Sequence, residues 1–163
     1  MIYYSKNFSS ETTPKRKDLE LVRHRITLFH LFASGEKCTF RKAVERIRFF
    51  LMTCGKAEEI AMYCNGVFAH SSIINPKCIK YPFLDNNEYV IGPCNTEKAF
   101  RGYGIYPYVL NWITESYCEN AKYYIFVDDN NYASIRGIEK AGFGYRGEAH
   151  EDRLKRYHIK LHN

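Results

Sequence analysis

Apolar and polar positions along the chain change their spacing from segment to segment. Residues 26–33 are rich in β-branched and aromatic side chains and predict a strand. Thr39 then predicts a helix N-cap, and Gly55 predicts the end of that helix. The apolar residues between them recur at helical spacing, which places one apolar stripe on a helix of about three turns. The stripe consists of Phe40, Val44, Ile47 and Leu51.

A hairpin follows the predicted helix. Two apolar segments, 60–64 and 67–71, flank the dipeptide Asn65-Gly66. Because Asn and Gly adopt positive φ angles readily, this pair predicts the tight type I′ turn that joins two antiparallel strands. A further strand is predicted over 88–95.

The second half of the chain alternates between strand and helix patterns. A helical pattern starts near Gly104, and a short apolar strand is predicted over 122–127. Residues 132–141 predict a second helix, which Gly142 ends. Two strand-like segments complete the chain, 143–148 and 153–161. A meander of strands followed by strands alternating with helices predicts an α/β or α+β sheet with helices on its faces.

Length and composition favour a folded domain. The chain has 163 residues, of which 45% are hydrophobic and 16% aromatic, so we expect one domain over residues 1–163. The second half of residues 1–18 is polar, which suggests that this segment is a loose lead-in, an irregular stretch before the first strand or helix. No apolar run reaches the roughly 20 residues of a membrane helix, and no signal peptide is recognisable. We therefore expect a cytoplasmic protein without a membrane partner.

Charge and cysteine content narrow the function only a little. The net charge of +6 favours anionic partners, and the densest basic run, 15–25, is typical of a solvated surface. The six cysteines are scattered, with no C-x-x-C pair and no histidine at zinc-site spacing. We expect no metal site.

The sharpest chemical signal is the turn Arg101-Gly102-Tyr103-Gly104-Ile105-Tyr106, which precedes Pro107. Proline fits only the first turn of a helix, so a helix must begin close to Gly104. The N–H groups of residues 102–106 then point out of the positive end of that helix. Glycines let a bulky anion approach the backbone, and Arg101 adds a positive charge beside it. The segment predicts a pyrophosphate site.

Two other phosphate-binding loops do not fit this segment. A P-loop motif, G-x-x-x-x-G-K-[ST], occurs nowhere in the chain. A dinucleotide fingerprint would place a third glycine where Pro107 stands. The alternative that Gly102 and Gly104 merely form a tight turn, with Arg101 in solvent, stays open on these residues alone.

Two downstream segments make the chain resemble a known family. Asn131-Tyr132-Ala133-Ser134 opens the second helix, and Lys140-Ala141-Gly142-Phe143 ends it. Together with the Arg101–Tyr106 turn, these segments resemble the R/Q-x-x-G-x-G/A, N-x-x-S/A and Lys-x-Gly-Phe segments of the Gcn5-related N-acetyltransferases, the GNAT family. The resemblance covers about residues 88–147.

The resemblance implies a fold and a cofactor. The fold would be a central, mostly antiparallel, splayed β-sheet with helices on both faces, and the cofactor would be acetyl-coenzyme A (acetyl-CoA). Its pantetheine arm would lie in the splay, against Asn131 and Ser134 on one side, although plain N-capping is the alternative for both residues. The remaining implied cofactor-binding residues are Cys94, Asn95, Thr96, Arg101, Gly102, Tyr103, Gly104, Ile105 and Tyr106.

The sequence departs from the family at two positions. Tyr106 replaces the last small residue of the turn, and Ile138 stands where many members carry a tyrosine that protonates the leaving thiolate. An isoleucine cannot donate a proton. For the acid the candidates are Tyr145 and Tyr132, and the alternatives are that water protonates the thiolate or that it leaves unaided. For the base the candidates are Glu97 and Asp128, with His70 and Glu88 as further alternatives.

Three function hypotheses follow. The first is an N-acetyltransferase that moves the acetyl group of acetyl-CoA directly to a primary amine of a small molecule, such as a nucleotide-linked amino sugar, or of a protein. The second is a catalytically degenerate module of the same fold that binds or senses acyl-CoA. The third and weakest is a nucleic-acid-binding domain that uses residues 15–25 and exposed aromatic side chains. Monomer and homodimer both stay open.

Overall fold

The structure is a computed structural model that describes residues 1–10, 14, 16–27 and 40–160, with only the backbone for 40–42. In chain order the elements are β1 (Ile2–Asn7), β2 (Leu19–Arg25), α1 (Phe40–Met52), β3 (Glu58–Cys64), β4 (Val67–Asn75), β5 (Glu88–Thr96), the 3₁₀ turn η1 (Lys98–Phe100), α2 (Ile105–Ser116), β6 (Lys122–Val127), α3 (Tyr132–Lys140), β7 (Gly144–Glu151) and β8 (Tyr157–Ile159).

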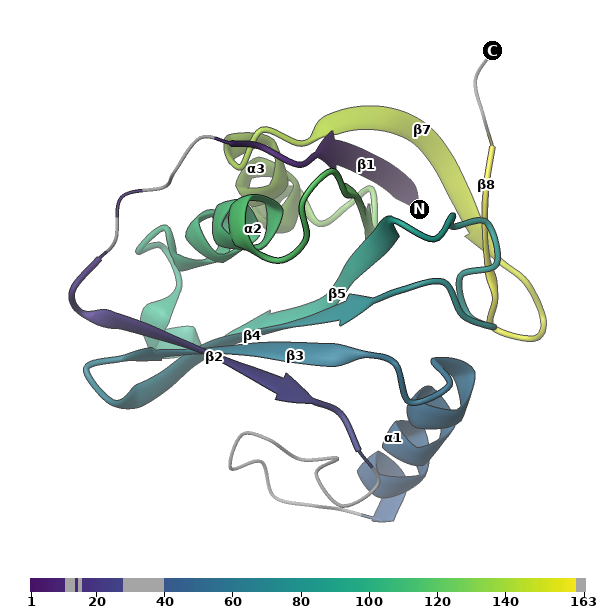
Figure 1. Cartoon of the computed structure of the whole chain (residues 1–163), viewed down its shortest axis with the longest axis horizontal. Coiled ribbons are helices and arrows are strands. Elements are labelled where there is room, and N and C mark those ends of the chain that lie inside the picture. The colour runs from purple at the N-terminus through teal and green to yellow at the C-terminus, as the bar shows by residue number, and fades with distance from the viewer. Residues whose placement is uncertain (11–13, 15, 28–39, 161–163) are drawn as a thin grey trace.

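The described strands form one open sheet in the order β2-β3-β4-β5-β6-β1-β7-β8. All neighbouring strands run antiparallel except β5 and β6, which run parallel (Figure 1). The predicted mixed, mostly antiparallel sheet is therefore confirmed.

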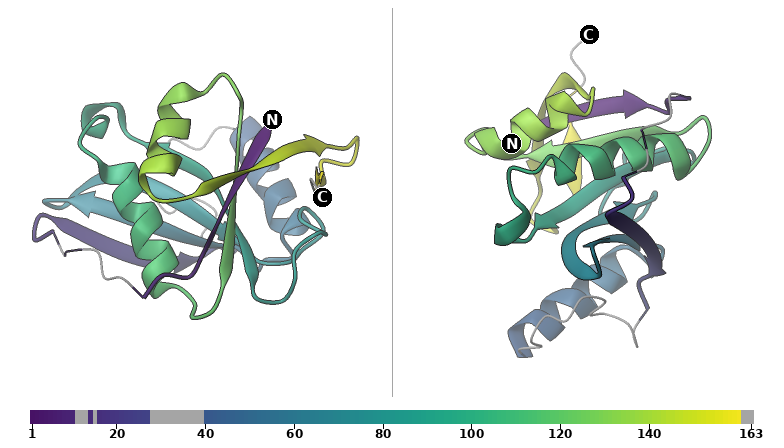
Figure 2. Two further views of the ribbon diagram at one scale, coloured as in Figure 1. Left: turned by 90° about the horizontal axis from the view of Figure 1, so that it is seen from above. Right: turned by 90° about the vertical axis from the view of Figure 1, so that its left-hand side faces the viewer.

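Helices lie on both sides of the sheet. α2 and α3 pack side by side over one face, and α1 lies beyond the other (Figures 1 and 2). The larger apolar core fills the space between the sheet and α2 and α3, and a smaller, mainly aromatic cluster lies on the opposite face. Among the described residues, no helix combines the length and apolar character needed to cross a membrane.

The expectation of a loose lead-in is wrong for residues 2–7. They form β1, which pairs with β6 on one side and β7 on the other, in the interior of the sheet. Successive side chains of a strand point to opposite faces, so Tyr3 enters the aromatic cluster while Tyr4 enters the larger core. A strand buried on both faces shows no alternation of apolar and polar residues, which is why the pattern gave no signal.

The other predicted elements have mixed outcomes. The hairpin at Asn65-Gly66 is confirmed, with φ angles of 49° and 78° at the two turn residues. Both helices of the second half and the helix from residue 40 are confirmed within a residue or two. The basic run proves to contain β2, which pairs with β3. The strand expected over 26–33 and the Thr39 cap fall mostly outside the described residues, and residues 26–27 follow β2 without belonging to a strand.

The parallel pair of β5 and β6 is short, and this shapes the molecule. It ends at Val90 and Tyr124, although β5 continues to Thr96 and β6 to Val127. Beyond Val90, β5 stays paired with β4 across an irregularity that contains Gly92 and Pro93. Proline has no N–H to donate and is tolerated in a strand at a bulge or an unpaired edge. The two strands therefore diverge after residue 90, as the family resemblance implies.

A buried amide holds the point of divergence. Asn75, which is fully buried at the end of β4, donates from Nδ2 to the carbonyl oxygens of Val90 at 3.2 Å and Gly92 at 2.7 Å. These two carbonyls lie on either side of the residue where β5 leaves β6. The side chain of Asn75 thus fixes β5 in its diverging path.

The central position of β1 makes a testable prediction. Tyr4 is 4% exposed, so Tyr4→Ala empties a large volume of the core and should lower the free energy of unfolding by about 3–5 kcal/mol. Lys17→Ala, an exposed position in the same segment, should change it by less than about 0.5 kcal/mol. Urea unfolding measures the free energy of unfolding of both variants. A similar, small change for the two variants would mean that the N-terminal segment is not part of the sheet.

Candidate functional site

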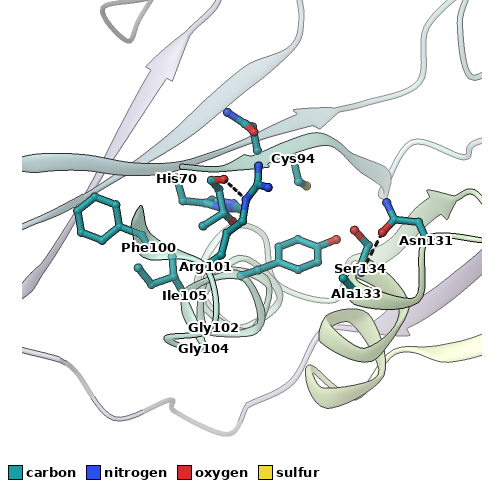
Figure 3. A pocket seen from close by; sticks show the side chains of 13 residues that line it. His70, Cys94, Phe100, Arg101, Gly102, Gly104, Ile105, Asn131, Ala133 and Ser134 are labelled. Carbon is teal, nitrogen blue, oxygen red and sulfur yellow. Dashed lines mark hydrogen bonds between the residues drawn. The ribbon is translucent and has the colours of Figure 1, made fainter. Parts of the chain in front are cut away.

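A cavity of about 410 Å³ lies where β5 diverges, between that strand and the start of α2 and α3 (Figure 3). Its walls come from the first half of β4, the second half of β5, the turn before α2 and the start of α3. The lining residues are His70, Cys94, Asn95, Thr96, Phe100, Arg101, Gly102, Gly104, Ile105, Tyr106, Asn131, Ala133 and Ser134.

The start of α2 forms a cradle of backbone N–H groups. The helix begins at Ile105 with Gly104 as its N-cap residue, which places Pro107 in the first turn as predicted. Gly102 and Gly104 have φ angles of 86° and 72°, in the left-handed region that only glycine adopts easily. No N–H group of residues 102–106 donates to a carbonyl within the described part of the chain.

The cradle is open toward solvent. A Cβ atom added to Gly102 or to Gly104 would meet no other atom within 4 Å. The two glycines are therefore required by backbone conformation, and the space beside them is available to a ligand. A left-handed turn that leads into a helix N-terminus directs several N–H dipoles at one point, which suits an anion.

Arg101 joins this cradle to β5. Its Nε donates to the carbonyl oxygen of Thr96 at 3.0 Å, so the guanidinium is held at the rim of the cavity (Figure 3). The side chain stays exposed, and its charge lies next to the N–H groups of the cradle.

The diverging half of β5 presents backbone groups to the cavity. The N–H of Glu97 donates to the carbonyl of Ala69 on β4, and N–H directions alternate along a strand. The backbone of Asn95 therefore faces β4, whereas the N–H and C=O groups of Cys94 and Thr96 face the gap. The hydrogen bond from Arg101 to the Thr96 carbonyl agrees with this alternation.

Asn131 and Ser134 lie across the gap from β5 at the start of α3. Asn131 is the N-cap residue, and its Oδ1 accepts a hydrogen bond from the Ser134 N–H at 3.2 Å (Figure 3). Asn131 therefore does cap α3, and it uses its side-chain carbonyl oxygen to do so. Its Nδ2 group, which capping does not use, borders the cavity and is a donor for a ligand.

Tyr106 turns away from the open cradle and inserts between the helices and β4. Its ring lies 5.7 Å from the ring of His70, centroid to centroid. It also lies so close to α3 that a Cβ atom added to Gly137 would be 2.7 Å from its Cδ1. A glycine on α3 therefore makes room for the large residue that replaces the small one expected at position 106.

A chain of buried hydrogen bonds runs beneath the cavity. His70, which is fully buried, contacts Thr96 Oγ1 through Nδ1 and Ser72 Oγ through Nε2, each at 2.7 Å. Ser72 Oγ in turn donates to Cys94 Sγ at 3.2 Å. We call Thr96, His70, Ser72 and Cys94, together with the Tyr106 ring that lies against His70, the buried relay.

Burial keeps the relay uncharged. It lowers the pKa of His70 to about 4 and raises the pKa of the Cys94 thiol to about 11. It also raises the pKa of Tyr106 far above the usual value for a phenol. At neutral pH all three groups are therefore neutral, and His70 is a poor general base.

The structure does not bring the three candidate catalytic side chains into the cavity. Glu97 is exposed beside η1 and accepts a hydrogen bond from Asn95 Nδ2 at 3.4 Å. Asp128 is exposed at the end of β6. Tyr145 lies on β7, packed edge-on against Tyr4 at 5.8 Å, with β1 and β6 between it and the gap. Ile138 is fully buried in the core.

Other lining residues were not predicted. His70 was considered only as a base, and Phe100, Ala133 and the link through Ser72 were not recognised. The sequence does carry a signal for this link. Positions 70 and 72 on one predicted strand and positions 94 and 96 on another alternate with their neighbours, so each pair faces one side of the sheet. Of the implied cofactor-binding residues, Tyr103 alone does not line the cavity; its side chain is 69% exposed.

Comparison with known proteins identifies the fold. No protein-family model matches the sequence, and no curated protein does. Three solved structures cover 90% of this chain. An acetyltransferase of the GNAT family from Colwellia psychrerythraea matches with a TM-score of 0.57 at 14% identity. A tandem GNAT protein from the clavulanic acid biosynthesis pathway matches with a TM-score of 0.61 at 13% identity.

The third is a conserved protein of unknown function from Staphylococcus epidermidis, with a TM-score of 0.62 at 14% identity. The chain spans 57%, 53% and 50% of the Staphylococcus, Colwellia and tandem proteins, about half of each. At these identities the likeness concerns the fold. The chain has the GNAT-like fold that its three sequence segments predict.

The low pKa of His70 predicts acid sensitivity. The folded protein holds this imidazole neutral with a pKa of about 4, whereas the unfolded chain takes up a proton near pH 6.5. The stabilisation is complete above about pH 6.5 and is lost as the pH falls toward 4, by about 3 kcal/mol. In urea unfolding at pH 7 and pH 4, His70→Gln should lose correspondingly less stability on acidification than the wild type. Equal losses would show that His70 is not held neutral.

The close contact of Tyr106 with Gly137 predicts that substitutions at these two positions have non-additive effects on the free energy of unfolding. Gly137→Ala should destabilise the protein by about 1–3 kcal/mol, because the new methyl group collides with the ring. In a Tyr106→Ala background the same change should be neutral or stabilising, since alanine is the better helix former. A double-mutant cycle measured by thermal or urea unfolding tests this. Additive effects would contradict the contact.

Proposed function

We propose that this protein binds acetyl-CoA in the cavity between β5 and α3 and transfers the acetyl group to a primary amine. The observation that carries the proposal is the cradle at residues 102–106, where left-handed glycines and a helix N-terminus direct N–H groups into open space. The fold supports it, because two of the similar structures are GNAT proteins.

The residues present fit such a cofactor. The pyrophosphate would accept hydrogen bonds from the cradle, with Arg101 beside it. The pantetheine arm carries amide groups that would pair with the open edge of β5 at Cys94 and Thr96 and with Asn131 Nδ2. The unpaired strand edge and the unpaired N–H groups are two independent features of the cavity that such a ligand would satisfy.

The residues of the chain itself would hold the thioester and the amine in place and would polarise the thioester carbonyl. The bound cofactor supplies an activated thioester. The N–H groups of Cys94 and Thr96 face the gap and are placed to donate to the carbonyl oxygen as negative charge develops there, a contribution of a few kcal/mol. The apolar side chains of Phe100 and Ile105 reduce access of water. Holding the thioester and the amine together supplies much of the remaining rate.

A second function, binding or sensing of acyl-CoA without transfer, is favoured by one observation. Among the described residues that line the cavity, none is a carboxylate, and the only imidazole is buried and neutral. A thiol-release assay with acetyl-CoA and a panel of amines, amino sugars, peptides and polyamines separates the two functions. Release of the CoA thiol with at least one acceptor supports acetyl transfer. Tight binding of acetyl-CoA without thiol release across the panel supports a protein that binds or senses acyl-CoA.

The cradle predicts which substitutions abolish cofactor binding. Arg101→Ala should weaken CoA binding about 10- to 100-fold, because a charge-assisted hydrogen bond to phosphate is lost. Gly104→Val should weaken it at least as much, since a branched side chain does not accept the φ of 72° and fills the space beside the N–H groups. Isothermal titration calorimetry with CoA measures both.

Each variant has a matched control. Gly66→Val introduces the same side chain at a glycine with φ of 78° and an open Cβ direction, but in the β3–β4 hairpin. Arg153→Ala removes an exposed positive charge away from the cavity. Both controls should bind CoA as the wild type does. Unchanged affinity in the Arg101 and Gly104 variants would remove the site assignment.

A further inference from the structure

A second, smaller cavity lies on the side of the sheet that carries α1. It has a volume of about 210 Å³ and is bordered by α1, by the segment that follows β4 and by the hairpin of β7 and β8 (Figure 1). None of its lining residues also lines the cavity between β5 and α3. A ligand bound here would therefore occupy a site separate from the CoA site.

Lys80 is held at the wall of this second cavity by its backbone. Its N–H donates to the carbonyl of Met52 at the end of α1 at 3.2 Å, and its carbonyl accepts from the N–H of Tyr157 on β8 at 2.9 Å. These two bonds connect α1 to the last described strand through residue 80. The Lys80 side chain is half-buried between the two elements.

The ammonium group of Lys80 lies among aromatic rings. Its Nζ is 5.1 Å from the ring centre of Phe49 and 5.6 Å from the ring centres of Tyr81 and Tyr157. Rings at such distances attract a cation, but the three N–H donors of an ammonium group still require acceptors. Within the described part of the chain, no oxygen accepts a hydrogen bond from Nζ and no carboxylate forms an ion pair with it. Burial lowers the pKa of Lys80, and the charge of Glu151 offsets this only in part.

The carboxylates that border the second cavity already have partners. Glu151 pairs with Lys155 at 2.8 Å, and Glu45 also has an interaction of its own. Arg48 is exposed on α1 and, among the described residues, has neither a hydrogen bond nor an ion pair through its side chain. Two cations without an anionic partner, Arg48 and Lys80, therefore border the same cavity.

The wall between these cations is apolar. Phe49 and Met52 line the cavity from α1, so a ligand that fills the space buries part of its own surface against them. An inorganic anion such as phosphate would leave this apolar wall uncovered. The cavity is also smaller than the roughly 300–1,000 Å³ pockets that hold drug-sized ligands, which indicates a small molecule.

We propose that the second cavity binds a small organic carboxylate, whose charged group pairs with Lys80 and Arg48 and whose apolar body packs against Phe49 and Met52. A carboxylate matches the planar guanidinium of Arg48 and also supplies an acceptor for the Lys80 ammonium. This inference does not depend on the proposed function, because the two cavities share no residue.

Three probe molecules separate the contributions of charge and apolar body. Benzoate carries both, benzamide has nearly the same shape without the charge, and inorganic phosphate has charge without an apolar body. In NMR titrations of the wild type, benzoate should bind at least about ten times more tightly than either of the other two probes. Equal binding of benzamide, tighter binding of phosphate or no binding of benzoate would each overturn the proposal.

Substitution of Lys80 tests its part in the site. Lys80→Met keeps an apolar side chain of similar length and removes the charge, so benzoate should bind about 10- to 100-fold more weakly. Lys77→Met removes an exposed lysine of the same segment that does not line the cavity, and should bind benzoate as the wild type does. Both variants should retain the CoA affinity of the wild type. Equal benzoate affinity in Lys80→Met and the wild type would contradict the assignment.

The pKa of Lys80 provides a test in the unaltered protein. An anion binds the ammonium form better than the neutral amine, so saturating benzoate should raise the pKa of Lys80 by about one unit or more. Carbon NMR of lysine-labelled protein follows this titration, and loss of the signal in Lys80→Arg assigns it. The other charged groups that line the cavity, Glu45, Arg48, Glu151 and Lys155, are the same with and without benzoate. An unchanged pKa with benzoate bound would overturn the proposal, whether or not Lys80→Met folds.

Discussion

The end of the parallel pairing between β5 and β6 is the constraint on which the rest of the structure depends. Three residue pairs hold the two strands together, after which β5 follows β4 instead. Asn75 keeps it there by donating to the carbonyls of Val90 and Gly92. A strand that stays paired on one side and is free on the other offers its backbone to whatever enters the gap, and no side chain is needed to create that edge.

The pairing that β5 keeps with β4 explains why polar residues are tolerated beneath the cavity. His70, Ser72 and Thr96 would each be costly to bury alone, but at neighbouring positions on β4 and β5 they satisfy one another. Tyr106 closes this set from the helix layer, and Gly137 provides its space. Tyr106, the large residue in the turn, therefore packs one residue away from Ile138, the apolar residue at the second departure from the family pattern, where α2 meets α3.

Local signals in the sequence were sufficient for much of the fold and for the anion cradle. Asn65-Gly66 specifies its turn through backbone preference, and Pro107 restricts where α2 can begin, so neither depends on distant residues. The place of β1 depends on pairing with strands from the other half of the chain, which no local pattern encodes. The buried relay and the contact of Tyr106 with Gly137 likewise join β4, β5, α2 and α3, so they became visible only in three dimensions.

The position of β1 also bears on how the chain reaches its structure. Ile2 pairs with Val127 and, on its other side, with Glu148, so the first strand of the chain finds its place only after both late strands have formed. Closing so long a loop is entropically expensive, and folds dominated by distant pairings fold slowly. Until β1 is inserted, β6 and β7 have facing edges without a partner, which is the kind of intermediate that associates with other chains. The wall of the cavity that comes from the start of α3, which follows β6 in the chain, thus depends on one of the last steps of folding.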